Sequence, residues 1–237
     1  MVHATAAAIH DIDVGKVSAG RAVTVTGLVV TGLAFNNGFD ANPPMQCRYR
    51  AFAQDPVGKA PCGIQLAALG PSCTMNASSG CDCPTAADSK TILSDLAIGD
   101  VVDLLGHVHL VAVDVDGGAV AEHELEVTMV TKTGTGEAMP TPISDPTLFA
   151  KDGVGYRDYE SMLVALQPAA GITVTAPSAK FASFSGGGAF FAGTYADAFE
   201  NGGQFPPAKS KWTSITGVAN PRAGGGIAPR SERDFVQ

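Results

Sequence analysis

The stretch Val23-Thr24-Val25-Thr26-Gly27-Leu28-Val29-Val30 shows the pattern on which the whole chain is built. Apolar and polar residues alternate as far as the glycine, which is the period of a strand with one buried face. A glycine inside such a strand permits a bend, after which the strand continues. The same arrangement returns at residues 101–108 and 212–219. In small closed barrels such glycines let a strand curl around the barrel, so we expect barrels here.

Composition supports an almost wholly β chain. The 237 residues are 45% hydrophobic and only 16% charged, with 28 glycines and 15 prolines. This profile is typical of short strands joined by many turns, whereas helices need more Leu, Glu, Lys and Arg. The best helix candidate is a turn or two near residues 145–150.

Alternating runs lie on both sides of residues 132–148, a segment without periodicity. The expected strands cover residues 48–54, 63–66, 101–113 and 119–131 before it, and 162–166, 172–175, 181–184, 189–195, 212–219 and 227–230 after it. The repetition favours a duplicated five-stranded barrel over a single sandwich. We therefore expect an all-β fold of two tandem small barrels, with domains at residues 1–140 and 150–237 joined by a linker that contains Pro and Gly.

The net charge of −8 is unevenly spread. Residues 1–150 hold 7 Lys and Arg against 16 Asp and Glu, whereas residues 151–237 hold 8 against 7. The first half would repel a phosphate backbone and the second is nearly neutral. Non-specific binding of nucleic acid is therefore not expected.

Five cysteines lie within one loop-like stretch that is rich in Pro, Gly, Ser and Asn. They are Cys47, Cys62, Cys73, Cys81 and Cys83. Such clustering favours disulfides formed in an oxidising compartment, and we expect two bridges and one remaining thiol, which could pair between chains. A metal site on the last three is the weaker interpretation, because Cys-X-Cys is not the common Cys-x2-Cys hook of zinc sites.

The start of the chain bears on localisation. No apolar run is long enough for a membrane helix or a signal peptide. Ala4-Thr5-Ala6 resembles the region around a signal-peptidase site, which suggests a mature secreted form with an added Met1; a short native start explains the same residues. Together with the cysteines, this predicts an extracellular or cell-surface protein, with the periplasm as an alternative.

Several phrases resemble the OB-fold modules attached to bacterial extracellular nucleases and the tail found in the same proteins. They are residues 12–27, 52–56 with 63–66, and 96–106 in the first half, and residues 159–164, 214–218 and 229–234 in the second. The resemblance implies two OB-like units and a binding function, without the nuclease catalytic domain. The cysteine loop, at about residues 70–89, is an insertion relative to that pattern and belongs to this protein's own role.

The second half offers one candidate binding patch, an aromatic residue among cations, as OB-folds use to stack bases and hold a backbone. Its residues are Lys209, Lys211, Trp212, Arg222 and Arg230, with Arg233 nearby. The competing interpretation makes the tryptophan part of the core and pairs Arg230 or Arg233 with Asp234. The acidic total favours this second interpretation.

Other constellations point away from catalysis. His107 and His109 share one face of a strand and, with His123 on its partner, would make a metal site, but solvated strand histidines are commoner. Asp114 and Asp116 before a glycine fit a hairpin turn better than a calcium loop. No nucleophile elbow, zincin helix or phosphate loop is present. We therefore predict a non-enzyme with no catalytic residues, no metal and no cofactor.

Two functions remain. The first is adhesion, assembly or self-association, with another copy of the chain or another surface protein as partner, because β surfaces with few lysines leave strand edges free to pair. The alternative is an oligonucleotide- or oligosaccharide-binding accessory module of an extracellular nuclease system.

Overall fold

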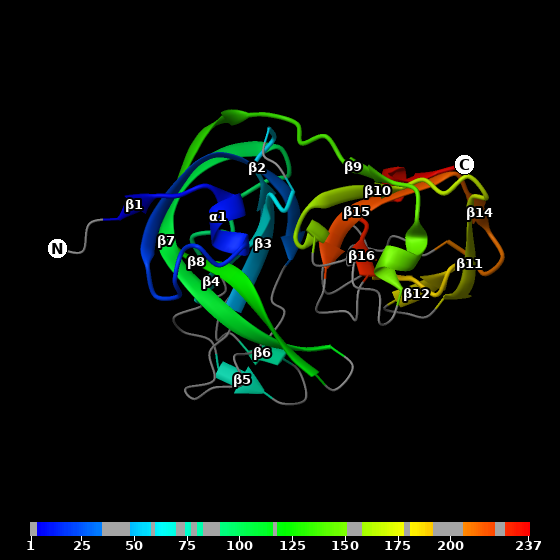
Figure 1. Cartoon of the computed structure of the whole chain (residues 1–237), viewed down its shortest axis with the longest axis horizontal. Coiled ribbons are helices and arrows are strands. Elements are labelled where there is room, and N and C mark those ends of the chain that lie inside the picture. Colours follow the sequence, from blue (N-terminus) through cyan, green and yellow to red (C-terminus); the bar gives the residue numbers. More distant parts are fainter. Residues whose placement is uncertain are drawn as a thin grey trace.

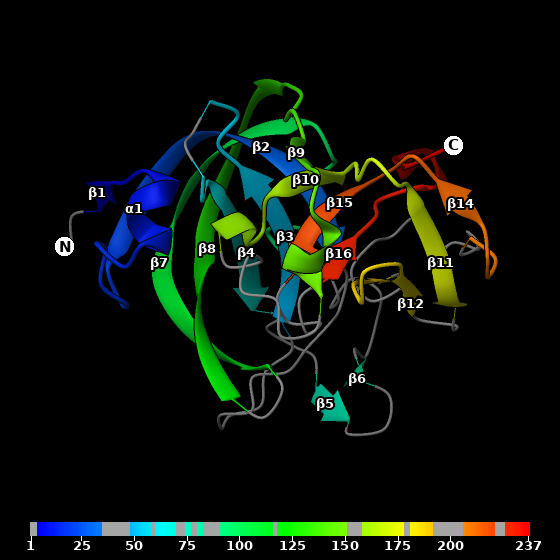
Figure 2. The ribbon, with the colours of Figure 1, turned by 45° about the vertical axis from the view of Figure 1, so that its right-hand side comes forward.

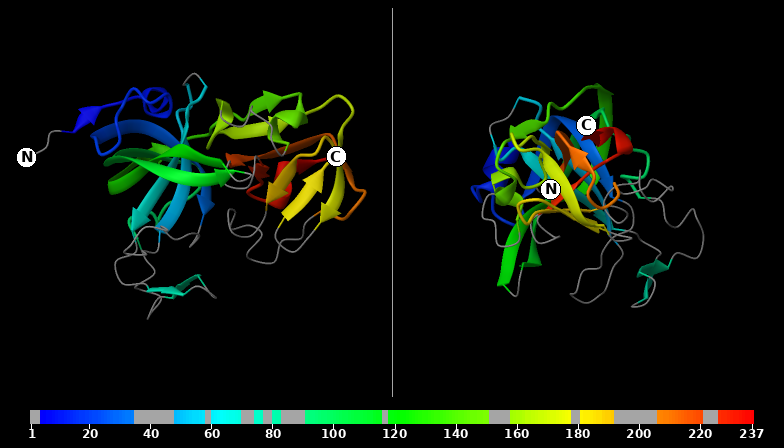
Figure 3. Two further views of the ribbon diagram at one scale, coloured as in Figure 1. Left: turned by 60° about the horizontal axis from the view of Figure 1, so that its bottom comes forward. Right: turned by 90° about the vertical axis from the view of Figure 1, so that its right-hand side faces the viewer.

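The computed structural model describes residues 4–34, 48–57, 60–69, 74–76, 80–82, 91–115, 118–150, 158–177, 181–191, 206–220 and 226–237. Within them the expected all-β fold is confirmed, since the helical elements are one short helix, α1 (Ile9–Asp13), the 3-10 turns η1 (Pro146–Phe149) and η4 (Glu232–Asp234), and 3-10 residues at 158–159. No helix among these residues is long and apolar enough to cross a membrane. Two β units lie side by side along the long axis of the molecule (Figures 1 and 3).

The strands of the first unit are β1 (Thr5–Ala6), β2 (Ala22–Ala34), β3 (Arg48–Gln54), β4 (Gly63–Leu69), β5 (Thr74–Asn76), β6 (Gly80–Asp82), β7 (Asp100–Val115) and β8 (Gly118–Thr135). The strands of the second unit are β9 (Thr141–Ile143), β10 (Leu163–Leu166), β11 (Ile172–Pro177), β12 (Phe181–Phe184), β13 (Ala189–Phe191), β14 (Lys211–Trp212), β15 (Ser214–Asn220), β16 (Gly226–Ala228) and β17 (Phe235–Val236).

The first unit is a closed five-stranded barrel. Its sheet runs β2-β3-β4-β8-β7, and β7 pairs again with β2. Numbered along the chain, this is the order one-two-three-five-four of the OB-fold, with the third and fifth strands parallel. Closure depends on the predicted bend in β2, because its register against β7 shifts between Val25 and Leu28, and Gly27 there has φ +72°.

Small and branched side chains fill this barrel. The interior contains Ala51 and Ala53 from β3 with Ile64 and Leu66 from β4, and α1 adds the buried side chain of Ile12. The helix was missed by the sequence analysis, because five residues are too few to show a helical period. It contacts β4 and β8, so it covers one side of the barrel in Figure 1.

The second unit repeats the order if β10 and β11 are halves of one strand interrupted by residues 167–171. Its sheet then runs β11-β12-β13-β16-β15-β10, again with the third and fifth strands, β13 and β16, parallel. Its core is more aromatic and contains Phe149, Phe184 and Phe235. The helix expected near residues 145–150 is the 3-10 turn η1, capped by the side chain of Asp145.

The two units meet through a small apolar cluster. Phe52 on the outer face of β3 packs with Leu163 and Val218 of the second unit, together with Val29 and Ala138. Each of these five side chains is at least nine-tenths buried. The apolar junction therefore occupies part of the outer surface of the first barrel.

Backbone contacts tighten the same junction. The Leu163 amide donates a hydrogen bond of 2.8 Å to the buried Gln54 side chain. Gly63 lies so close to the second unit that a Cβ there would sit 2.4 Å from the Ser161 carbonyl carbon. The units are thus joined by packing as well as by the chain.

β7 and β8 extend past the barrel as a two-stranded arm, visible in Figures 1 and 2. β7 pairs with β2 no further than His107, and β8 pairs with β4 only from Glu124 onward. Among the described residues, 110–115 and 118–123 pair only with each other. We call these two segments the arm.

Candidate functional site

A pocket of about 300 Å³ opens at the junction of the two units. Strand β2 contributes Val29, Val30 and Thr31, and the turn before β7 contributes Ile98. The second unit contributes Leu163 and Arg230. A pocket at a domain boundary that combines apolar and polar groups has the form of a small-ligand site.

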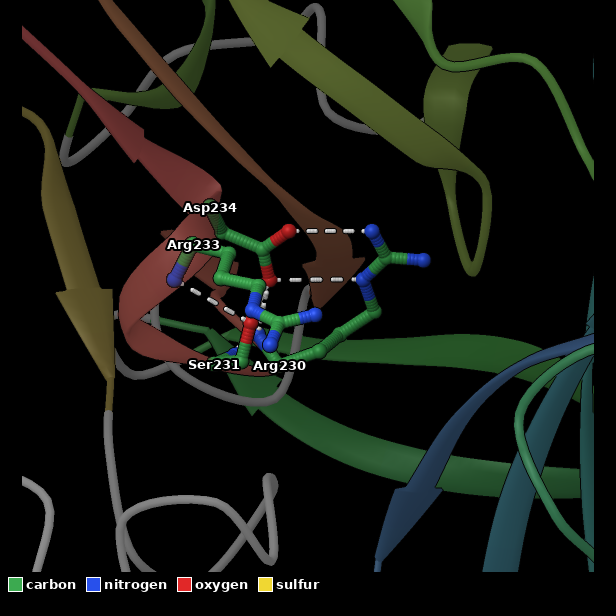
Figure 4. A network of polar contacts seen from close by, with 4 residues as sticks. All are labelled: Arg230, Ser231, Arg233 and Asp234. Carbon is green, nitrogen blue, oxygen red and sulfur yellow. Dashed lines mark hydrogen bonds and ion pairs between the residues drawn. The ribbon is translucent and has the colours of Figure 1, made fainter.

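Arg230 is held in one orientation by Asp234. Its Nη2 donates a hydrogen bond of 2.9 Å to Oδ1, and its Nε lies 3.3 Å from Oδ2 (Figure 4). Asp234 is almost fully buried, whereas the Arg230 side chain is 23% exposed. This two-pronged pairing fixes the plane of the guanidinium at the pocket wall.

The local sequence builds this arrangement. Ser231 begins the 3-10 turn η4 with a capping box, in which its hydroxyl accepts from the Arg233 amide at 3.2 Å. In return, Asp234 accepts from the Ser231 amide at 3.0 Å and also from the Arg230 amide. The carboxylate is therefore bound by backbone and side chain at once, which makes it a rigid support for Arg230.

A second polar cluster lies on the outer face of the first barrel. Arg50 on β3 and Glu124 on β8 form a buried ion pair with an Nε to Oε2 distance of 3.3 Å. Gln65 on β4 donates to the same oxygen, and His109 Nδ1 lies 3.8 Å from the other. OB-folds usually bind ligands on the corresponding strands, but here the charges neutralise each other away from water.

The structure describes the surroundings of four of the five residues of the predicted basic patch. Lys211 is exposed, and Lys209 has a positive φ of 69° in the turn before it. Trp212 packs against the second core, with its ring 5.4 Å from Phe235 and its Nε1 donating to Ser210. Arg230 pairs with Asp234 and lines the junction pocket, and Arg222 lies outside the described residues. The competing interpretation, a core tryptophan and a paired arginine, agrees with this geometry.

The histidines do not converge. His109 is opposite Glu124, whereas His123 is opposite Leu110, so His123 lies on the other face of the sheet from His107 and His109. Burial lowers the pKa of His123, because it disfavours the charged ring. Among the residues that the structure describes, no group of three His, Cys, Asp or Glu is placed to hold a metal ion. Asp116 and Gly117 of the hairpin turn fall outside that part of the chain.

Cys62 is a free, buried thiol, so it takes part in no disulfide in this structure. The placement of Cys47, Cys73 and Cys83, and of the Cys81 side chain, lies outside the description. Burial, followed by the Asp55 and Asp13 carboxylates, raises the pKa of the Cys62 thiol to about 11. The expected bridges among the other four cysteines stay a prediction.

Sequence reasoning missed Arg50, Gln65, Glu124 and Thr31. Arg50 and Gln54 alternate with alanines along β3, a pattern that indicates a solvent-facing row, yet both are buried. Only the register that brings β8 beside β4 shows that Glu124 reaches Gln65. The alternation correctly placed Arg50 and Gln54 on one face of β3, but it did not show that this face is buried.

No protein-family model matches the chain, and no curated protein matches it. Among solved structures, a chain assigned as an aspartyl-tRNA synthetase from Leishmania major Friedlin is 10% identical with a TM-score of 0.35, over 65% of this chain and 25% of that one. The aspartyl tRNA synthetase from Entamoeba histolytica is 13% identical with a TM-score of 0.32, over 64% and 26%. A small single-stranded DNA-binding protein from Streptomyces coelicolor is 11% identical with a TM-score of 0.27, over 49% and 96%.

This chain therefore spans about a quarter of the length of the two synthetase chains. The assignment of OB-like barrels rests on the strand order described above.

Proposed function

We propose that the protein is a non-catalytic, secreted or cell-surface β protein that acts in adhesion, assembly or self-association. The observation that supports this most directly is the arm of β7 and β8. Outside the barrel the arm is a two-stranded ribbon, and each of its strands has an outer edge that no described strand covers. Strand edges that lack a partner strand are templates for pairing with another chain.

The composition of the arm favours association. Its β7 segment reads Leu-Val-Ala-Val-Asp-Val and its β8 segment Gly-Ala-Val-Ala-Glu-His, without a single lysine or proline. Lysine and proline are the residues that natural edge strands use to prevent pairing. A two-stranded ribbon is also marginally stable alone in water, so a third strand from a partner would stabilise it.

The polar clusters support a role without catalysis. Arg50 is neutralised by Glu124 and Arg230 by Asp234, so both arginines serve first to hold structure. The buried Cys62 is kept protonated by its raised pKa, which makes it a poor nucleophile.

Self-association is tested by light scattering coupled to size exclusion over a wide concentration range. We expect the wild-type chain to form larger species as concentration rises. Leu110→Lys, at an exposed arm position, should shift the equilibrium toward monomer, whereas Met129→Lys, on the barrel part of β8, should not. A wild-type chain that stays monomeric at every concentration contradicts self-association.

Secretion is tested by differential alkylation and mass spectrometry of protein purified without reductant. Cys62 should be the free thiol, and Cys47, Cys73, Cys81 and Cys83 should be alkylated only after reduction. If all five cysteines react before reduction, the extracellular assignment loses its main support.

The alternative function is a nucleic-acid- or oligosaccharide-binding accessory module of an extracellular nuclease system. The OB strand order favours it, because this fold commonly presents oligonucleotides or oligosaccharides on its second and third strands. Anisotropy of labelled single-stranded DNA at low and high salt tests it. Binding that weakens as salt rises would favour this function over assembly, and no binding at low salt rejects the nucleic-acid form.

A further inference from the structure

We infer that the junction pocket is a binding site for a neutral, hydroxyl-rich ligand, one sugar unit of a glycan. The site is distinct from the arm, so it adds a ligand to the proposed assembly function without depending on it. The pocket holds about 300 Å³, at the lower end of the range for small-molecule sites.

Hydrogen-bonding groups with unused capacity line this pocket. Arg230 donates hydrogen bonds to Asp234 through Nε and Nη2. Figure 4 shows its third nitrogen directed away from that carboxylate, on the side of β2 and β3. Thr31 is 1% exposed, and its hydroxyl has no hydrogen-bond partner among the described residues. A buried hydroxyl without a partner costs free energy, so a ligand that bonds to it gains what the empty site loses.

Charge excludes an anion as the preferred ligand. Arg230 is the one cation among the lining residues, and it is opposed by Asp234 and Glu137. The lining thus carries one more negative than positive charge, so a phosphate or carboxylate would meet net repulsion. A neutral ligand with both donors and acceptors can use the arginine donor, the threonine hydroxyls and the Glu137 carboxylate together.

An apolar surface completes the site. Val29 and Leu163 lie in the wall, and Ile98, which is 46% exposed, lies at the solvent side. A sugar ring presents C–H groups on its faces and hydroxyls at its edge. The apolar residues can pack against the C–H faces of the ring, and the polar groups can bond to its hydroxyls. One sugar therefore fits this lining better than an aliphatic chain or an ion.

Saturation-transfer NMR on the full chain tests the proposal, with a panel of neutral monosaccharides and disaccharides as probes and acetate and phosphate as anion probes. Ile98→Trp should fill the mouth of the pocket and weaken binding roughly tenfold or more. Ile92→Trp is the matched control, because Ile92 is similarly exposed at 39% but does not line the pocket. Thr31→Val should weaken binding while leaving the melting temperature unchanged or higher, since it removes an unpaired buried hydroxyl.

The outcomes separate clearly. Binding of at least one sugar that Ile98→Trp reduces and Ile92→Trp does not reduce supports the site. No signal from any sugar overturns it, as does binding of the anions in place of the sugars. Sugar binding that Ile98→Trp leaves intact also overturns it, because the ligand then lies elsewhere on the chain.

Discussion

The sharpest stability prediction concerns Asp13, the last residue of α1. Its Oδ2 is buried and has no hydrogen-bond partner among the described residues. Burial raises the pKa of this carboxyl from 3.8 to about 8, so in the folded protein it is protonated at neutral pH. In the unfolded chain it ionises near its ordinary value. Stability from this group is therefore fully present below about pH 3.8 and is lost as the pH rises toward 8.

The magnitude follows from the shift. Each pH unit between the two pKa values costs about 1.4 kcal/mol, so raising the pH from about 5 to about 7 should cost roughly 3 kcal/mol through Asp13 alone. Asp13→Asn keeps the shape and removes the titration. Urea titrations give the unfolding free energy of each protein. The excess of the variant's value over the wild-type value should increase with pH up to about pH 8 and then stay constant.

Asp11→Asn is the matched control on the same helix. Lys16 lowers the pKa of the exposed Asp11 through a hydrogen bond and its charge, so this variant should lose a little stability at neutral pH and show no rise with pH. Groups that Asp13 does not influence titrate equally in variant and wild type and cancel in the difference, and the Cys62 thiol, whose pKa Asp13 helps to raise to about 11, titrates above this pH range. A difference for Asp13→Asn that stays flat from about pH 5 to about pH 8 would refute the buried, protonated carboxyl.

Three further perturbations test other parts of the fold. Cys62 should react with alkylating reagent far more slowly in the native protein than in urea, as followed by mass spectrometry, because its thiol is buried with its pKa raised to about 11. Arg50→Met should lower the unfolding free energy by about 3–5 kcal/mol, since it leaves Glu124 buried and charged, and the double variant with Glu124→Leu should recover much of the loss. Gly63→Ala should destabilise by roughly 1–3 kcal/mol by pressing on the second unit, whereas Gly134→Ala, with open space around it, should be near neutral in the same urea titration.

Much of the architecture could be predicted from the sequence because strand period and glycine bends are local signals. The alternation over residues 48–54 has the same bounds as β3, and Gly27 marks the bend that closes the first barrel. The long hairpin of β7 and β8 was also expected, although each strand is longer than its alternation indicated. α1 was not, because Ile9 and Ile12 are too few residues to show a period.

The candidate sites were harder to predict, because they depend on which faces the fold covers. Arg230 was singled out by its type, but its place at the junction pocket follows from the packing of two units. Thr31 carries no signal at all in the sequence, since it looks like one more polar position of an alternating strand. His123 was placed with His107 and His109, and a register of one residue puts it on the opposite face.

The way the units meet bears on the choice between assembly and nucleic-acid binding. An OB barrel that binds single strands keeps aromatic and basic side chains free on its second and third strands. Here Phe52 of β3, the second barrel strand, is buried in the junction, where it packs with Leu163. Arg50 of the same strand forms an ion pair with Glu124, and the Gln54 side chain accepts a hydrogen bond from the Leu163 amide. A single strand would have to displace the second unit and compete with a buried carboxylate, so these contacts favour the proposed assembly function over nucleic-acid binding on this face.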